Sequence, residues 1–318
     1  MVSRALPRGP RALAALLPAI EPLADLLQEQ GLTRTPPHRR EGLHPLVVPL
    51  AAEGEASVVG VLRWPSPPPP QLLLVRTERQ PADLRDGTAS LASLTLRPLG
   101  TPAQYARRAA AEAEASAGPR QIISAAAALS SAVAAAPYVP GELGASKLQL
   151  DQYLLLRVGP FPDVWERMAR LRLERADETA ALVAAERATA GNPSWGCCLW
   201  LQAQLMGALG RREEERDLAL AALETPLWTL GASLAEVQAA AQLAHVDDVF
   251  ALFKQMEEAL RLQQNAPPRS IGELALARAL ECMDEVVRRR SRWDDARPHV
   301  ASALEEAGLT DVAELAAL

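Results

Sequence analysis

The sequence predicts a mainly α-helical protein with a small β-containing region near its N-terminus, and three observations support this. Hydrophobic residues make up 49% of the 318 positions but aromatic residues only 4%, so Ala, Leu and Val must build most of the interior, as in closely packed helices. Short apolar runs between turn residues, typical of strands, occur only before residue 100. A helical pattern with a period of 34 residues follows later in the chain.

We expect four segments along the chain. They are a flexible or targeting segment with a short helix (1–40), a small β-containing region (41–100), Ala-rich helices (101–145) and a helical repeat domain (146–318). The first segment is rich in arginine and has no acidic residue in its first twenty positions, so it is either an organelle transit peptide or an unstructured start before a short helix at 22–30.

Four apolar runs predict strands in the second segment: Leu46–Val48, Val58–Leu62, Leu72–Val75 and Leu94–Leu96. The pair Thr101-Pro102 then predicts a helix start, because threonine is a good N-cap and proline fits the first turn. Helices are expected over 102–115 and 119–135.

The repeat rests on two helix–turn–helix patterns. Ala176 and Gly210 are turn residues that lie 34 positions apart, and small residues follow each turn at helical spacing. One such hairpin leaves an apolar face uncovered, so neighbouring hairpins are expected to stack and bury it. The alternative is an irregular helical bundle that matches the pattern by chance.

These residues resemble the tetratricopeptide repeat (TPR) family over roughly 160–260. The matching positions are Trp165, Ala169, Ala181, Ala185, Ala188 and Pro193 in the first unit, and Ala203, Met206, Gly210, Ala219 and Ala222 in the second. Glu215 departs from the pattern, because it stands where the family has a small residue between the two helices. A third unit is expected near Ala244 and a fourth near Trp293–Ala296. The resemblance implies an α-solenoid of about three to four helical hairpins.

Three short strings give a second resemblance. Residues 158–167, 226–231 and 305–309 are similar to a family of chloroplast-targeted proteins of plants and green algae. This resemblance implies a chloroplast location and a role in assembling photosynthetic complexes. Without it, the three cysteines, which form no disulfide or zinc pattern, indicate only a reducing intracellular compartment.

The TPR resemblance also implies a binding face, because the first helix of each unit lines a concave groove in that family. Carried over, these positions are Asp163, Glu166 and Arg170 in the first unit, Trp200 and Gln204 in the second, and Leu234, Gln238 and Gln242 in the third. We expect a peptide or helix of a partner protein to bind there. Trp200 is equally compatible with a core position beside Trp195.

The acidic tail of a chaperone is not expected to bind in this groove. Glu166 and Arg170 replace the lysine and asparagine that bind such tails in the family, and Gly231 and Ala235 replace its later basic residues.

Composition and motifs exclude several other classes of function. The net charge of −6 and pI near 5.4 argue against nucleic acid. The apolar runs are too short for an integral membrane segment, so a soluble chain is expected. The four histidines are scattered, and no metal, cofactor or catalytic motif is found.

We therefore expect a non-enzymatic interaction module, an assembly or biogenesis factor for a multi-subunit complex. The alternatives are a structural subunit of a larger complex, or an adaptor that carries a small N-terminal ligand-binding domain.

Overall fold

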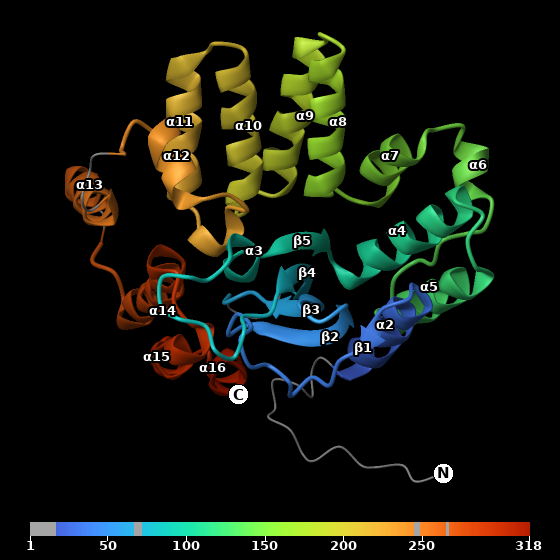
Figure 1. Cartoon of the computed structure of the whole chain (residues 1–318), viewed down its shortest axis with the longest axis horizontal. Coiled ribbons are helices and arrows are strands. Elements are labelled where there is room, and N and C mark those ends of the chain that lie inside the picture. The colour runs from blue at the N-terminus through green and yellow to red at the C-terminus, as the bar shows by residue number, and fades with distance from the viewer. Residues whose placement is uncertain (1–16, 67–71, 245–248, 265–266) are drawn as a thin grey trace.

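An antiparallel sheet near the N-terminus is the element around which the helices are arranged (Figure 1). The computed structural model describes residues 17–66, 72–244, 249–264 and 267–318. The strands lie in sequence order and are β1 (Thr33–Arg34), β2 (Val47–Glu53), β3 (Ser57–Arg63), β4 (Leu72–Glu78) and β5 (Arg97–Gly100). The sheet of the predicted β-containing region is thus confirmed, and both of its faces are covered.

The two faces of the sheet belong to two different cores. Val48, Val61 and Leu74 pack into a cluster with helices near the N-terminus. Leu62 and Val75, which face the other way, join a cluster with the C-terminal half of the chain. Side chains of a strand alternate between its faces, so burial on both sides explains why these strands are almost continuously apolar.

The last predicted strand is wrong by a few residues. Leu94–Leu96 does not form a strand; instead a helical turn, α3 (Leu91–Leu94), precedes β5. The side chain of Ser90 caps this turn by accepting a hydrogen bond from the N–H of Ser93. A local cap therefore overrode the apolar pattern.

One face of the sheet is covered by two helices from the N-terminal half, α2 (Leu17–Glu29) and α4 (Pro102–Ala115). The helix α5 (Arg120–Ala132) packs on both of them and completes this core. Thr101 caps α4 as predicted, in a capping box in which its backbone N–H donates to Gln104 Oε1 at 2.9 Å. Three short elements follow: α6 (Glu142–Ser146), α7 (Leu150–Tyr153) and a π-helical turn, η1 (Leu154–Val158).

Two helical hairpins stack above β5 (Figure 1). The first is α8 (Pro162–Glu174) with α9 (Glu178–Gly191), and the second is α10 (Gly196–Ala208) with α11 (Arg212–Leu223). Their turn residues Ala176 and Gly210 both have positive φ, 57° and 74°. The small residues of the pattern are fully buried where the helices meet: Ala169, Ala181, Ala185, Ala203, Ala219 and Ala222.

Glu215, the departure from the repeat pattern, is accommodated by a glycine on the facing helix. A Cβ atom at Gly207 would lie only 2.4 Å from Glu215 Oε1. The glycine thus leaves room for the larger side chain, and Arg212 pairs with its carboxylate at 2.7 Å.

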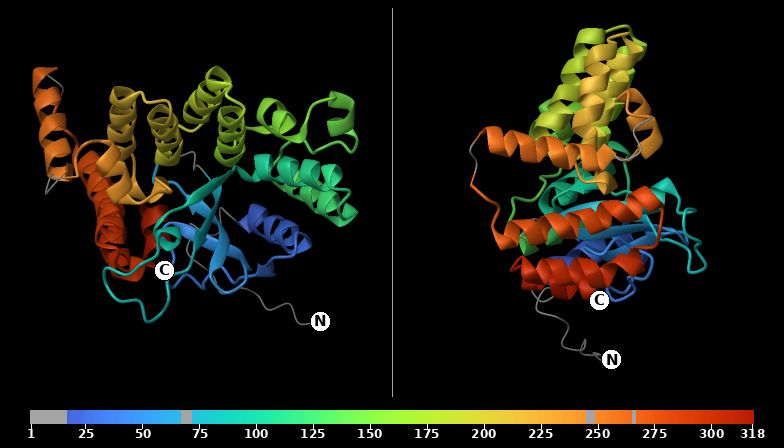
Figure 2. Two further views of the ribbon diagram at one scale, coloured as in Figure 1. Left: turned by 45° about the horizontal axis from the view of Figure 1, so that its top comes forward. Right: turned by 90° about the vertical axis from the view of Figure 1, so that its left-hand side faces the viewer.

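The α-solenoid of three to four hairpins is not confirmed, and the stacked hairpins end at α11. A 3₁₀ turn, η2 (Leu227–Thr229), and the seven-residue α12 (Leu234–Ala240) come next, and α13 (Val249–Gln263) lies apart from them (Figure 2). The helices α14 (Ile271–Arg289), α15 (Trp293–Glu306) and α16 (Thr310–Ala317) then pack on each other and return to the sheet (Figure 1). Asp247 and Asp248, expected in the third unit, lie outside the described residues, as does segment 1–16 of the predicted targeting region.

The return of α15 to the sheet has a clear physical cause. Trp293, predicted to begin a fourth repeat, is fully buried, and its Nε1 donates to the carbonyl of Ser93 at 2.8 Å. Its backbone N–H donates to Gln80 Oε1 at 2.9 Å. The next residue, Asp294, accepts from the N–H of Gly42 at 3.0 Å. These bonds hold the start of α15 against the N-terminal region rather than against α13.

A cluster of aromatic rings joins the sheet, the hairpins and the C-terminal helices. We call Trp64, Trp195, Trp228, Trp293 and His44 the tryptophan cluster. Ring centroids lie 4.7 Å apart for His44 and Trp228, 4.6 Å for His44 and Trp293, and 5.1 Å for Trp64 and Trp228. Trp195 meets Trp228 edge to face at 6.4 Å. Such pairs add attraction beyond the burial of their area.

One buried carboxyl group ties α14 to η2. Asp284 on α14 accepts a hydrogen bond from the backbone N–H of Leu227 at 2.7 Å. Burial raises the pKa of this carboxyl to about 7, although the hydrogen bond from Leu227 and the charge of Arg288 oppose the shift. The folded chain therefore favours the protonated form of Asp284.

This raised pKa predicts how stability depends on pH. Since the pKa of Asp284 is higher in the folded than in the unfolded chain, its contribution is full below the unfolded pKa of 3.8 and is lost as the pH rises through about 7. As the pH rises from 5 to 8, loss of this contribution should lower the free energy of unfolding by about 1 to 3 kcal/mol. In urea titrations, Asp284→Asn should therefore gain stability over the wild type at pH 8 more than at pH 5. An equal difference between the two proteins at both pH values would contradict this.

Candidate functional site

A groove of about 170 Å³ lies between β5 and the first helices of the two hairpins. We call it the β5 groove. Its lining comes from the β5 side (Leu96, Arg97, Pro98), from α8 (Pro162, Asp163, Glu166, Arg170), from α10 (Cys197, Cys198, Trp200, Leu201, Gln204) and from the turn before α12 (Leu230, Gly231). The structure thus brings together the five residues predicted from the first two repeat units.

The three residues predicted from the third unit lie elsewhere. Leu234 is partly buried against the main core, and Gln238 accepts a backbone hydrogen bond from Leu243 at 2.8 Å. Gln242 is exposed in the turn after α12, with a φ of 59°. None of the three lines the β5 groove, because the chain turns away after α11.

The strand β5 narrows the groove that the TPR resemblance implies to be open. The N–H of Leu96 donates to the carbonyl of Trp228 at 2.8 Å, which fixes the start of the strand beside the hairpins. At the other end, Gly100 lies so close to Phe161 that an added Cβ would meet its ring at 2.9 Å. The role of β5 in forming this groove is not predictable from the sequence. No local signal links residues 97–100 to the helices that begin at Pro162 and Gly196.

Asp163 is held by the chain itself. Its two carboxylate oxygens accept hydrogen bonds from Arg108 on α4, at 2.9 and 2.7 Å. Burial would lower the pKa of Arg108, but the hydrogen bonds and charges of Asp163 and Glu112 outweigh this effect and raise it. Arg108 also lies over the Phe161 ring at 4.9 Å. Asp163 therefore fixes α8 to α4 more than it faces a ligand.

The other predicted residues form a polar row with an indole beside it. Arg170 pairs with Glu166 at 2.8 Å and donates to Gln204 Oε1 at 3.0 Å, so the row crosses from the first hairpin to the second. Half of the Arg170 side chain remains exposed. Trp200 both lines the groove and packs partly against the main core. The groove position and the core position expected for it are therefore both occupied by the same side chain.

This arrangement suits binding of an extended chain segment. The guanidinium and amide groups of the row can exchange their bonds to each other for bonds to a peptide backbone, and the indole offers apolar area. The thiol of Cys198 is a poor nucleophile here, because its hydrogen bond with Cys197 and its burial both raise its pKa. Among the described residues, no group of His, Cys, Asp or Glu is arranged to hold a metal ion.

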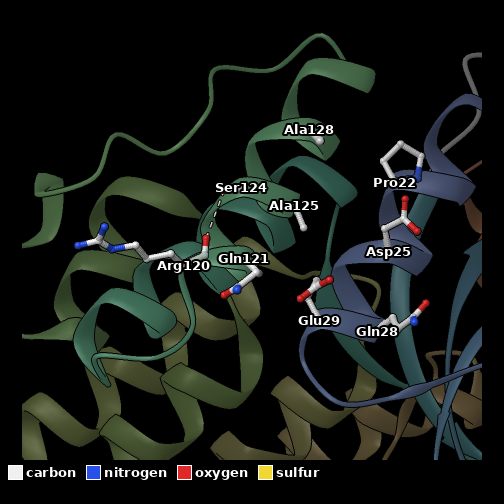
Figure 3. Close-up of a pocket in the computed structure, with 9 residues that line it drawn as sticks. All are labelled: Pro22, Asp25, Gln28, Glu29, Arg120, Gln121, Ser124, Ala125 and Ala128. Carbon is white, nitrogen blue, oxygen red and sulfur yellow. Dashed lines mark hydrogen bonds between the residues drawn. The ribbon is translucent and has the colours of Figure 1, made fainter.

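A larger hollow of about 780 Å³ lies between α2 and α5 but shows no site (Figure 3). Its polar side chains are exposed and point in different directions rather than toward one another. Asp25 pairs with Arg34, and Ser124 donates to the carbonyl of Arg120. We therefore treat it as ordinary surface.

The Asp163–Arg108 pair yields a test of its structural role. Asp163→Asn should lower the free energy of unfolding by about 1 kcal/mol, because a partly exposed bidentate pair is lost. Glu112→Gln, which weakens a second partner of Arg108 but leaves the bidentate pair, should cost less. Urea denaturation followed by circular dichroism measures both. Equal losses, or none, would show that the pair does not hold α8 in place.

Comparison with known proteins places these features in context. A family model described as PAB N-terminal matches residues 11–157, and one described as PAB middle domain matches residues 162–247. The boundary between them falls between η1 and α8. The family models give PAB regions rather than tetratricopeptide repeats, which corrects the family expected for 160–260. No solved structure matches the chain.

One curated relative covers most of the chain. It is "Protein IN CHLOROPLAST ATPASE BIOGENESIS, chloroplastic" of Arabidopsis thaliana, which is 29% identical over 290 residues, 90% of this chain and 82% of the relative. This supports the expected resemblance to a chloroplast-targeted plant family and the expected chloroplast location. Among the described residues, every helix is too short or too polar to cross a membrane. The chain is thus similar, over most of its length, to a chloroplast protein named for ATPase biogenesis.

Proposed function

We propose that this chain is a non-enzymatic assembly factor that binds an unassembled protein subunit during biogenesis of the chloroplast ATPase. The relative's name supplies the complex and the process. The observation that carries the mode of action is the β5 groove, in which a polar row and an indole from two hairpins lie side by side.

The composition of the groove favours binding over chemistry. Glu166, Arg170 and Gln204 bond to one another rather than to a buried acid or base. Such mutually bonded polar groups can be exchanged for a ligand's backbone groups with little net loss of hydrogen bonds. The volume of about 170 Å³ left by β5 can take one or two side chains of an extended segment, whereas a whole helix, about 10 Å across with its side chains, is too large for it.

A matched pair of arginine variants on α8 tests the groove. Arg170→Ala removes the centre of the polar row, while Arg172→Ala removes an arginine of the same helix that pairs with Asp177 outside the groove. We expect Arg170→Ala to weaken binding to a purified, unassembled ATPase subunit about tenfold, the effect of one charge-assisted hydrogen bond. Arg172→Ala should bind as the wild type does.

The measurement is isothermal titration calorimetry with each non-membrane subunit in turn. Circular dichroism must first show that both variants are folded. Equal affinities of the wild type and Arg170→Ala would remove the β5 groove from the proposal. Failure of the wild type to bind any unassembled subunit would overturn the proposed function itself.

A further inference from the structure

A second pocket in the helical hairpins, of about 300 Å³, lies where α9, α10 and α11 meet. These helices stand side by side (Figure 1). Each contributes side chains three or four positions apart, which share one face of the helix. They are Leu182 and Glu186 from α9, Gln202 and Met206 from α10, and Glu214, Asp217 and Leu218 from α11. We call this the α9–α11 pocket.

The α9–α11 pocket and the β5 groove lie on opposite faces of α10. Trp200 and Gln204 line the groove, whereas Gln202, two positions from each, lines the pocket. Two positions correspond to about 200° around a helix, so the side chain of Gln202 points away from the groove. A ligand in the pocket therefore leaves the groove free.

An amide without a partner in the chain forms part of the pocket wall. Gln202 is only 8% exposed, yet its side chain makes no hydrogen bond to any described residue. Buried polar groups in folded proteins nearly always have a partner, and leaving one unpaired costs free energy. Since Gln202 lines the pocket, its amide offers hydrogen bonds to whatever fills it.

An amide can bond to an acid or to a base, and the charges around it decide between them. Among the described residues that line the pocket, three are acidic and none is basic. Glu214 and Asp217 pair with Arg211 and Arg216, but both pairs are exposed, and such pairs contribute little and exchange readily. Glu186 is exposed and has no ion-pair partner among the described residues. The pocket therefore attracts a cation and repels an anion.

The remaining lining favours arginine among the cations. Leu182, Met206 and Leu218 are only partly exposed and give an apolar wall, which suits the aliphatic stem of a basic side chain. A planar guanidinium carries five donors and can reach acceptors on several helices at once, unlike a compact ammonium group. Among the described residues, no set of carboxyl groups is arranged to hold a metal ion. Free arginine would bring its own α-carboxylate to the acidic mouth, which an arginine within a peptide does not.

We propose that the α9–α11 pocket binds an arginine side chain from a basic segment of another protein. The charge of the chain favours another protein over a second copy. With a net charge of −6, two copies repel each other, and a two-fold contact at the pocket would bring its carboxylates together. The inference goes beyond the proposed function, because it assigns a second site with a different ligand and holds whichever partner occupies the β5 groove.

Methionine-methyl NMR of the full chain tests the pocket directly. Of the five methionines in the chain, Met206 lies in the pocket lining, so its signal, assigned with Met206→Leu, reports binding there. The probe is a blocked pentapeptide with one arginine between glycines. Its match carries citrulline, whose urea group has nearly the same shape but no charge. We expect the arginine peptide to shift the Met206 signal saturably, and the citrulline peptide to bind about tenfold more weakly because a charge-assisted hydrogen bond is lost.

Three variants, shown to be folded by circular dichroism, locate the interaction. Gln202→Leu keeps the size of the side chain but removes the amide, and should weaken binding of the arginine peptide about tenfold. Glu186→Gln with Asp217→Asn removes two surface charges and should weaken it about fivefold. Glu213→Gln changes an exposed acidic residue of α11 outside the lining and should bind as the wild type does.

Other results would overturn the inference. An unmoved Met206 signal, or equal binding of the arginine and citrulline peptides, would show that the pocket is not a cation site. Equal binding of a lysine peptide would overturn the choice of arginine. If sedimentation velocity shows a wild-type dimer that Gln202→Leu dissociates, a second copy fills the pocket instead of another protein.

Discussion

The packing of Trp228 is the interaction on which the rest of the structure depends. This residue lies in a 3₁₀ turn between the helical hairpins and the C-terminal helices, and it is fully buried. Its ring contacts His44 and Trp64 from the N-terminal region and Trp195 from the start of α10. Its backbone carbonyl accepts the hydrogen bond that fixes β5. One residue therefore joins three parts of the chain that local sequence patterns describe separately.

This junction explains the shape of the β5 groove. Hairpins stacked in an open solenoid would leave the inner faces of α8 and α10 to a partner alone. Here the tryptophan cluster holds the sheet beneath them, so β5 occupies part of that space and leaves a narrow groove. The same junction draws α14 to α16 back to the sheet. The shape of the β5 groove thus follows from the packing of the tryptophan cluster.

Local signals in the sequence predicted the local elements well. Thr101 caps α4, and the turn residues Ala176 and Gly210 adopt left-handed backbone conformations. The five residues predicted from the first two units lie together because a repeat period fixes which helix positions face the same way, and their role in binding stays a prediction. The division of the chain into four segments stays a prediction.

Features set by distant residues could not be predicted in the same way. The buried indole of Trp293 bonds to Ser93, 200 positions earlier, and no local pattern reports such a contact. The sequence near Trp293 fits a worn repeat unit, so the expected solenoid continued where the chain in fact returns to the sheet. The same holds for α13, where Val249 is buried but Met256 and Leu260 are 57% and 52% exposed: an apolar pattern does not show which of its residues the rest of the chain covers.

Hydrogen–deuterium exchange of the Trp228→Ala variant tests the central claim most directly. If the Trp228 ring joins the three parts, its removal should speed amide exchange together in β5, in α10 and in α14 and α15, since a buried tryptophan contributes about 3 to 5 kcal/mol. Faster exchange confined to the turn around residues 227–229, with the sheet and both groups of helices unchanged, would show that these parts are held together by other contacts.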